Sequence, residues 1–347
     1  MRIKDEADAL VAVRECGRAL EFVPEALRTP EVCLAAVKQD GWALEFVPEA
    51  LKTEALCLEA VRRRGRALRF VPDRLKTPEI YLATVRRNGA MLRLVPEALQ
   101  TPALCADAAA EWPDIVQELP EALLLAHPSI VLAAVATMAR FRELYRLNRV
   151  VPVALWRDPD FCLAAVRLDG GLLAAVPGDM RTPELCLEAV RRAGWTLQCV
   201  PEHLRTPELC LEAVRQDGRA LEDVPEALKT EELCRQAVLN VGWALKDVPE
   251  ALKTKELCLT AVRDPWTLQY VPLALRTQEL CLAAVKADGM AIRYVPEMLK
   301  TPEICLAAVQ DAGVWALAEV PEAMRTAEIC EAATASGPLM ETVCDEE

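Results

Sequence analysis

The chain has 347 residues, of which 53% are hydrophobic and 5% aromatic, so a core of Leu, Val, Ala and Cys is expected instead of an aromatic-rich β-sandwich. Its 40 Lys and Arg stand against 53 Asp and Glu, a formal charge of −13. Such a surface repels phosphate backbones on average, which disfavours nucleic acid as the main partner unless basic residues gather on one face. Residues 1–6 lack the apolar stretch of a signal peptide, and a cytoplasmic location is expected.

A unit of about 24 residues recurs from end to end of the chain. The units begin at Asp5, Thr29, Thr53, Thr77, Thr101, His127, Asp158, Thr182, Thr206, Thr230, Thr254, Thr277, Thr301 and Thr326. A unit of this size cannot bury its apolar face alone, so it must stack on its neighbours. We therefore expect an all-α fold, a right-handed, curved α-solenoid or superhelix of about 13 tandem helix-turn-helix repeats.

The repeats are not equally regular. We expect one solenoid domain over residues 1–347, with regular repeats in 1–100 and 158–325, divergent or expanded repeats in 101–157, and a capping half-repeat in 326–347. Residues 122–139 form an uncharged apolar stretch nearly long enough to raise the question of a membrane span. His127-Pro128-Ser129 interrupts it where the repeat starts a helix, so we interpret it as a buried repeat junction.

The repeat at residues 182–205 shows how each unit begins. Thr182 is a helix N-cap, Pro183 occupies the first helical position, and Glu184 places negative charge in the first turn. Leu185, Cys186, Ala189 and Val190 then form one apolar stripe, which Leu187 widens. Gly194 is expected to end the helix in a left-handed conformation.

The second half of the repeat is less regular. Leu197, Val200 and Leu204 keep a helical spacing, but Pro201 disfavours helical geometry at Val200. The pattern predicts either a short helix followed by a separate 3₁₀-like turn or one helix kinked at the proline. A Val-Pro or Leu-Pro pair recurs in nearly every unit, so this break belongs to the architecture.

Residues 31–52 carry the repeat pattern best: an apolar helix ending in Ala-Val-Lys-Gln-Asp-Gly, then Trp-Ala-Leu-Glu-Phe-Val-Pro-Glu-Ala-Leu-Lys. This pattern resembles a bacterial repeat family catalogued as a domain of unknown function, DUF4116. The resemblance covers nearly the whole chain and is weakest between residues 103 and 157. It implies a helical repeat array and, because the function of that family is unknown, nothing about catalysis.

Eleven cysteines fall at the same inward position of the first helix: Cys33, Cys57, Cys105, Cys162, Cys186, Cys210, Cys234, Cys258, Cys281, Cys305 and Cys330. Equivalent positions in stacked repeats lie beyond the ~7 Å Cα separation that a disulfide spans. The sequence also has no C-x-x-C pair for zinc or iron–sulfur binding. We interpret these cysteines as small core side chains in a reducing compartment, and expect no metal and no cofactor. Cys16, Cys199 and Cys344 lie outside this position and are the expected reactive thiols.

The other polar residues give no catalytic set. The two histidines, His127 and His203, have no companion nucleophile and carboxylate, and the glycines come singly, without a phosphate-binding loop. We therefore expect that the protein is not an enzyme. Basic residues that close most repeats (Arg28, Lys52, Lys76, Arg181, Arg205) and glutamates after the Val-Pro pairs fit helix-end electrostatics and solubility. A second basic stripe near the end of the first helix is interpreted in the same way, although it also offers contacts to phosphates: Arg14, Lys38, Arg62, Arg86, Arg167, Arg191, Arg215, Arg263 and Lys286.

The position after the repeat glycine is the best candidate for partner binding. We call it the Trp/Arg register; it reads Arg18, Trp42, Arg66, Ala90, Leu172, Trp195, Arg219, Trp243, Trp266, Met290 and Trp315. The residue four positions on varies too, between Phe, Leu, Cys, Asp, Tyr and Glu. A position that exchanges Trp for Arg suits a surface that reads a partner, because these residues dominate binding hot spots. The alternative is that the register residues cover the groove to the neighbouring repeat.

The expanded unit is the second candidate. Residues 136–151 lengthen one repeat and concentrate Arg140, Arg142, Arg146 and Arg149, which predicts a partner-docking insertion, a bend between two halves, or merely a degenerate repeat. The preferred interpretation is a non-enzymatic protein-protein interaction scaffold or adaptor with a protein partner and no membrane or metal. The alternative is a nucleic-acid-binding solenoid in which Arg stripes contact phosphates and Trp stacks on bases. A thiol-dependent enzyme is a third possibility, and it predicts one unusually reactive cysteine.

Overall fold

Most repeats fold as one α-helix followed by a six-residue and then a three-residue 3₁₀-helix. The computed structural model of the chain describes residues 3–335, and no strand occurs among them. The chain is an all-α repeat solenoid, as the 24-residue period predicts. Packing divides it into two compact units, Met1–Leu168 and Asp169–Glu347, and each is described by itself.

The α-helices begin at the repeat starts and are mostly ten residues long. In the N-terminal unit they are α1 (Glu6–Glu15), α2 (Pro30–Gln39), α3 (Glu54–Arg63), α4 (Pro78–Arg87), α5 (Pro102–Glu111), α6 (Glu121–Ala126), α7 (Pro128–Arg140), α8 (Leu147–Val150) and α9 (Pro159–Leu168). In the C-terminal unit they are α10 (Pro183–Arg192), α11 (Pro207–Gln216), α12 (Glu231–Asn240), α13 (Lys255–Ala261), α14 (Gln278–Ala287), α15 (Pro302–Leu317) and α16 (Ala327–Ala335).

The 3₁₀-helices fill the rest of each repeat. Those that follow the α-helices are η1 (Gly17–Phe22), η3 (Gly41–Phe46), η5 (Gly65–Phe70), η7 (Gly89–Leu94), η9 (Pro113–Glu118), η12 (Gly170–Ala175), η14 (Gly194–Cys199), η16 (Gly218–Asp223), η18 (Gly242–Asp247), η20 (Pro265–Tyr270) and η22 (Gly289–Tyr294). The three-residue helices are η2 (Glu25–Leu27), η4 (Glu49–Leu51), η6 (Asp73–Leu75), η8 (Glu97–Leu99), η13 (Gly178–Met180), η15 (Glu202–Leu204), η17 (Glu226–Leu228), η19 (Glu250–Leu252), η21 (Leu273–Leu275), η23 (Glu297–Leu299) and η24 (Glu322–Met324). The expanded region adds η10 (Leu144–Arg146) and η11 (Val153–Arg157).

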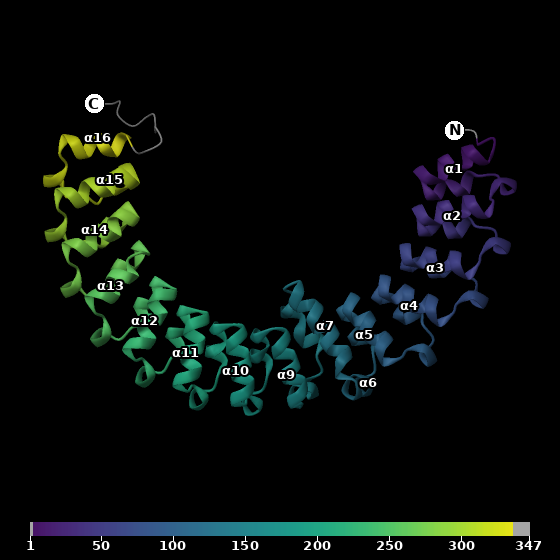
Figure 1. Cartoon of the computed structure of the whole chain (residues 1–347), viewed down its shortest axis with the longest axis horizontal. Helices are drawn as coiled ribbons and strands as arrows, with labels where there is room; N and C mark the ends of the chain where they lie inside the picture. Colours follow the sequence, from purple (N-terminus) through teal and green to yellow (C-terminus); the bar gives the residue numbers. More distant parts are fainter. Residues whose placement is uncertain (1–2, 336–347) are drawn as a thin grey trace. The chain divides into compact units, whose positions relative to one another are not determined.

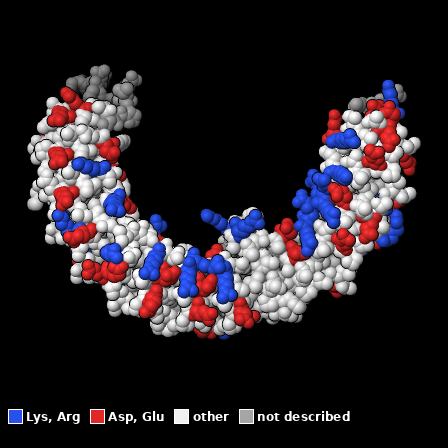
Figure 2. Space-filling view, in the orientation of Figure 1, with Lys and Arg blue, Asp and Glu red and all other residues white. Residues whose placement is uncertain are grey.

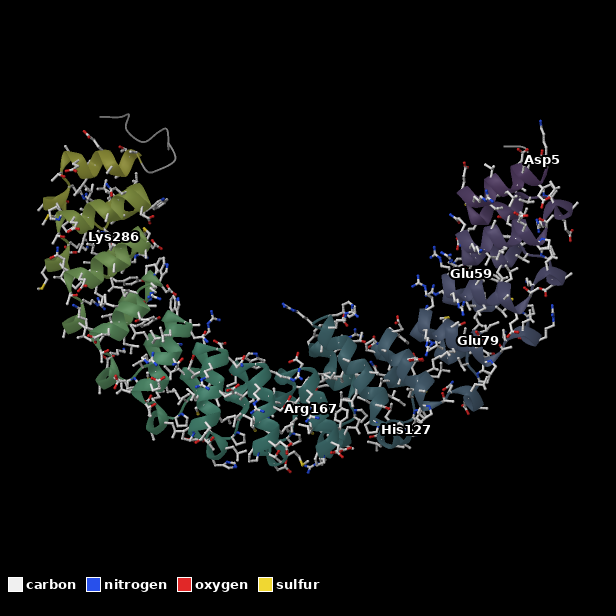
Figure 3. The ribbon with its side chains drawn as sticks, viewed as in Figure 1. Asp5, Glu59, Glu79, His127, Arg167 and Lys286 are labelled. Carbon is white, nitrogen blue, oxygen red and sulfur yellow. The ribbon has the colours of Figure 1, made fainter. Side chains whose placement is uncertain are left out.

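Within each unit the repeats stack in two rows. Successive α-helices pack side by side, as α1 on α2 and α10 on α11, and successive six-residue 3₁₀-helices form a second row, as η3 on η5 and η14 on η16. Figure 1 shows the α-helices in chain order within each unit. The start of the first repeat, Asp5, and the start of the expanded repeat, His127, are labelled in Figure 3.

The predicted first helix is confirmed. The Thr182 hydroxyl accepts a hydrogen bond from the Leu185 N–H at 3.3 Å, with Pro183 at the first helical position. The apolar stripe of α10 is fully or almost fully buried. Burying a side chain such as Leu185 stabilises the fold by about 1.5–3 kcal/mol, so most of the stability of each repeat comes from this stacking.

The role predicted for the repeat glycine is wrong. Gly194 is not left-handed; it begins η14, and the α-helix ends on an extended residue, Ala193. The glycine is instead required by close packing between repeats. A Cβ on Gly17 or Gly170 would lie 2.5 or 2.7 Å from a backbone carbonyl oxygen in the next repeat, which is closer than van der Waals contact allows. Among residues 3–335, the left-handed glycine is Gly313, with φ 57°, where the repeat from Thr301 carries its extra residue.

The second half of the repeat follows the first of the two predicted alternatives. A short helix, which is itself 3₁₀, ends at an extended Val200 with φ −77° and ψ 127°, and a separate 3₁₀ turn follows Pro201. The proline therefore separates two short helices and does not kink a longer one.

Most of the basic residues that close the repeats connect one repeat to the next. The Arg28 guanidinium donates to the carbonyl of Val23 in its own repeat and to that of Phe46 in the next, both at 2.9 Å. Lysine also connects two repeats, through its ammonium group: Lys52 Nζ donates to Phe70 O of the next repeat at 3.2 Å and pairs with Glu49 at 2.7 Å. Lys52 is buried, so the solvated role expected from the sequence is wrong for it. We call a closing basic residue that bonds a carbonyl of the next repeat a clip.

The divergent region lies in the N-terminal unit and breaks the regular pattern. His127 separates α6 from α7, which confirms that the apolar stretch 122–139 spans a repeat junction. No helix of residues 3–335 is long and apolar enough to cross a membrane.

Candidate functional site

Except for Trp315, which lies in α15, the Trp/Arg register corresponds to the second residue of the six-residue 3₁₀-helices, directly after the glycine or, for Trp266, after Pro265. An acidic residue just before the glycine fixes its backbone: the carboxylates of Asp40 and Asp217 accept the N–H of Trp42 at 3.1 Å and of Arg219 at 3.0 Å. The structure corrects one member of the register. Gly171, not Leu172, holds this position in its repeat, and Leu172 is buried.

The two variable positions found in the sequence meet across the repeat boundary. The Trp of one repeat contacts, edge to face, the aromatic residue four positions on in the next repeat. The pairs and their centroid distances are Trp42–Phe70 (5.6 Å), Trp243–Tyr270 (5.7 Å) and Trp266–Tyr294 (6.2 Å). The register therefore does cover the neighbouring repeat, which was one of the two interpretations.

These contacts with the next repeat leave much of the register exposed to solvent. Trp195, Trp243 and Trp315 are 45%, 37% and 75% exposed, whereas Trp42 and Trp266 are half-buried. The arginines of the register, Arg18, Arg66 and Arg219, are exposed. Both compact units thus present large aromatic and guanidinium groups at the same position of several repeats, with Trp in some repeats and Arg in others.

Three cavities open along the register. Two in the N-terminal unit, of about 490 and 460 Å³, share the lining residues Arg66, Arg87 and Asn88. A third in the C-terminal unit, of about 340 Å³, is lined by Arg219, Glu222, Trp243, Ala244, Lys246, Asp247 and Tyr270. The cavities differ in chemistry: the first two are rich in arginine, and the third combines aromatic rings with charges of both signs.

The acidic groups near the third cavity are perturbed by their surroundings. Burial raises the pKa of Asp247, which Lys246 opposes from 3.9 Å. Burial also raises the pKa of Asp223, which Arg205 opposes. Lys246 itself pairs with Glu222 at 3.1 Å. These two aspartates occupy, in two C-terminal repeats, the position at which several other repeats carry Phe or Tyr.

The arginines of the expanded repeat have different roles. Arg146 is half-buried and pairs with Asp114, 32 residues earlier, and with Glu143 at 2.9 Å, so it holds the insertion against η9. Arg140 stacks on exposed Phe141 at 5.7 Å, and Arg142 adopts a left-handed φ of 59°. Arg140 and Arg142 remain candidates for partner binding, whereas the position of Arg146 is explained by its ion pairs.

Some functional candidates were missed from the sequence. Trp112 stands two residues earlier than the register position of its repeat, but the Arg93 guanidinium stacks on its ring at 5.4 Å and it lines the 490 Å³ cavity. Arg69 lies over both Trp42 and Phe70. The signal available in the sequence was the density of arginine between residues 62 and 93.

The eleven cysteines at the inward position of the first helix form a cysteine ladder, which lies inside the repeats, as predicted. Its members in residues 3–335 are buried, except that Cys330 is half-buried. Burial raises the pKa of Cys162, Cys186, Cys210, Cys234 and Cys258 from 9.0 to about 11, which keeps these thiols protonated and unreactive at neutral pH.

Among the cysteines outside the ladder, Cys16 is exposed, whereas Cys199 is half-buried and burial raises its pKa. The prediction that Cys199 is reactive is therefore not supported, and Cys344 lies outside the described residues. We expect one rapidly labelled thiol within residues 3–335 when the native protein is treated with iodoacetamide at pH 7.5, and Cys16→Ser should remove it. Rapid labelling of Cys199 in the native state, located by peptide mass spectrometry, would contradict this expectation.

In the described part of the chain, the histidines and acidic residues supply no metal site. His127 makes no capping hydrogen bond through its side chain, and His203 is exposed. Within residues 3–335 no group of three His, Cys, Asp or Glu is close enough to hold a metal ion.

The repeated α–3₁₀–3₁₀ unit, stacked in two rows, defines a tandem helical-repeat protein, an α-solenoid. Four stretches, residues 8–52, 54–100, 182–229 and 277–325, match the family described as a domain of unknown function (DUF4116). Together they cover more than half of the chain, so the chain belongs to this family. A comparison with curated proteins found no match.

Proposed function

We propose that the protein is a non-enzymatic scaffold or adaptor that binds a protein partner along its Trp/Arg register. The observation that carries the proposal is the row of Trp and Arg side chains at one position of successive repeats, which leads into cavities of different composition. Trp, Tyr and Arg dominate protein-binding hot spots because they bury large areas at low entropic cost. A repeated backbone with a varied residue at one place also allows each repeat to contact a different part of the partner.

Binding of a nucleic acid is the second candidate, because arginines gather in the N-terminal unit. The stacking geometry favours protein instead. Arg18 and Arg69 lie over the ring of Trp42 at 5.4 and 5.9 Å, so a base would compete with guanidinium groups for stacking on this ring. Titrations with RNA and DNA at low and moderate salt separate the two functions, since tight and steeply salt-dependent binding would favour the nucleic acid.

Removing two exposed register residues tests the protein-binding function. We expect the double variant Trp195→Ala, Trp243→Ala to lose partners that the wild-type protein captures from its native host, as identified by quantitative mass spectrometry. Each large aromatic truncation at an interface costs on the order of 2 kcal/mol, so at least a tenfold loss is expected.

The matched control is Leu273→Ala, Met298→Ala, which removes two exposed apolar side chains from the three-residue 3₁₀-helices of the same unit. This control should keep the captured partners. Equal capture by the register variant and the wild-type protein would show that the register in the C-terminal unit is not the binding site.

A further inference from the structure

Arginine is concentrated in one segment of the N-terminal unit, although the unit as a whole has equal numbers of basic and acidic residues. Residues 1–168 hold 23 Lys and Arg against 23 Asp and Glu, but residues 62–93 alone hold ten basic and two acidic residues. Figure 2 shows basic side chains gathered over α3 and α4 in this unit. We call this patch the arginine surface; it consists of Arg62, Arg63, Arg64, Arg66, Arg69, Arg86, Arg87 and Arg93.

Carboxylates of the protein neutralise only part of this surface. The ion pairs are Arg63–Glu59 (3.0 Å), Arg86–Asp107 (2.9 Å), Arg93–Glu118 (2.9 Å), Arg64–Asp40 (3.5 Å) and Arg62–Glu79 (3.9 Å). Glu59 and Glu79 are labelled in Figure 3. Arg66, Arg69 and Arg87 have no carboxylate partner among residues 3–335. Clustered, unpaired cations repel one another, and this repulsion is relieved when an anionic ligand binds.

Several of these guanidinium groups are held in place before any ligand arrives. Arg69 lies 5.9 and 5.8 Å from the ring centroids of Trp42 and Phe70, and Arg93 lies 5.4 Å from that of Trp112. The Arg87 side chain donates to the Arg63 carbonyl at 3.3 Å. A guanidinium stacked on a ring keeps its N–H edge free for a carboxylate, and less rotamer entropy is lost on binding.

Two cavities open in the arginine surface, and their spacing follows that of the repeats. The 460 Å³ and 490 Å³ cavities belong to consecutive repeats and share Arg66, Arg87 and Asn88. Packed helices lie about 8–10 Å apart, and a peptide in the extended polyproline II conformation advances about 3.1 Å per residue with three residues per turn. Every third side chain of such a peptide therefore lies on one face, about 9 Å from the next, in register with successive cavities.

We propose that the arginine surface binds an extended acidic segment of a partner protein, with a carboxylate at about every third residue. The proposal rests on the protein-binding function proposed above and specifies the chemistry of one partner segment. Arginine forms bidentate hydrogen bonds with carboxylates, which a planar guanidinium held by stacking is well placed to make. Arg18 lies over the ring of Trp42 and Arg93 over that of Trp112, each at 5.4 Å, so a base would compete with a guanidinium group for stacking, which favours an acidic peptide over a single-stranded nucleic acid.

Fluorescence anisotropy with the full chain tests this proposal. The probe is a labelled 12-residue peptide with Glu at every third position among Gly, Ser and Ala, compared with a peptide carrying Gln at those positions and with labelled dT12 and U12. We expect micromolar binding of the acidic peptide at low salt, weakening as salt rises, and at least tenfold weaker binding of the Gln peptide and both oligonucleotides. The variant Arg66→Gln, Arg87→Gln should bind the acidic peptide at least tenfold more weakly.

The matched control is Arg191→Gln, Arg192→Gln, which removes two arginines from the end of α10, the position that Arg86 and Arg87 occupy in α4. It should bind the peptide within twofold of wild type, and unchanged circular dichroism of both variants shows that they fold. No binding of the acidic peptide, or equal binding by the Arg66→Gln, Arg87→Gln variant, overturns the proposal. If an oligonucleotide binds more tightly than the acidic peptide, the proposal is overturned in favour of a nucleic acid. If the wild-type protein self-associates and the Arg66→Gln, Arg87→Gln variant does not, the proposal is overturned in favour of a second copy of the chain.

This experiment is independent of the test of the register. If the peptide fails to bind while the Trp195→Ala, Trp243→Ala variant still loses its partners, the scaffold function stands and only the acidic-segment proposal is wrong. If the peptide binds as expected while the Trp variant keeps its partners, binding resides in the arginine surface and not in the C-terminal register.

Discussion

Replacing Gly194 with alanine should destabilise the C-terminal unit by about 3 kcal/mol, because overpacking against immobile backbone is among the costlier core substitutions. A Cβ there would overlap the carbonyl oxygen of Ala213 and lie 2.9 Å from the backbone N of Asp217. Ala213 lies in the last turn of α11 and Asp217 caps that helix, so relief requires separating two stacked repeats. The change is measured by urea unfolding followed by circular dichroism.

Gly178→Ala is the matched control in the same unit. A Cβ at Gly178 has no atom within 4 Å, and the residue is exposed at the start of η13. It should leave stability unchanged or raise it by up to about 1 kcal/mol, since alanine reduces the entropy of the unfolded chain. Equal stabilities of the two variants would contradict the role assigned to close packing at Gly194.

Alkaline pH should unfold this protein earlier than a protein with a purely aliphatic core. Cys162, Cys186, Cys210, Cys234 and Cys258 have a pKa of about 11 in the fold against 9.0 when solvated, because burial disfavours the thiolate. Below pH 9 both states are protonated and the contribution of these thiols to stability is fully present. Between pH 9 and 11 only the unfolded chain loses the protons, so each thiol lowers the free energy of unfolding by up to about 1.4 kcal/mol per pH unit.

Urea unfolding at pH 7.5, 9, 10 and 11 in the presence of a reductant measures this effect. Cys210→Ala removes one of the thiols and should make the decline between pH 9 and 11 shallower by up to about 1.4 kcal/mol per pH unit. The comparison with wild type removes the contributions of Lys and Tyr, which titrate in both proteins. A decline of identical slope in the two proteins would contradict the argument.

The sequence predicts well those structural features that depend only on residues within one repeat. The Thr182 cap, the proline at the first helical position and the stripe through Leu185 and Val190 depend on neighbours a few residues away, and the structure confirms each. The inward position of the cysteines follows from the same helical period. Local propensity and periodicity therefore fix the first helix and its buried face.

Features determined between repeats were predicted poorly. The glycine after each helix matches a common helix-ending signal, but its cause is a carbonyl in the next repeat, as Gly170 shows against Ala189. The pairing of Arg146 with Asp114 spans 32 residues, which no local pattern reveals. Whether Trp faces solvent or its neighbour also depends on the next repeat: Trp243 contacts Tyr270, whereas Trp315 is largely exposed.

The clips formed by the closing basic residues have a consequence for how such a chain can change in length. Arg276 reaches forward to the carbonyl of Tyr294 at 2.8 Å, as Arg28 does to Phe46 at 2.9 Å, so the junctions use the same contacts. Duplication or loss of one whole repeat creates only junctions of a kind that the chain already contains. A gene encoding this protein can therefore gain or lose 24-codon blocks by recombination while the new interfaces keep contacts of the same kind, and selection can then vary the register residue of each new copy.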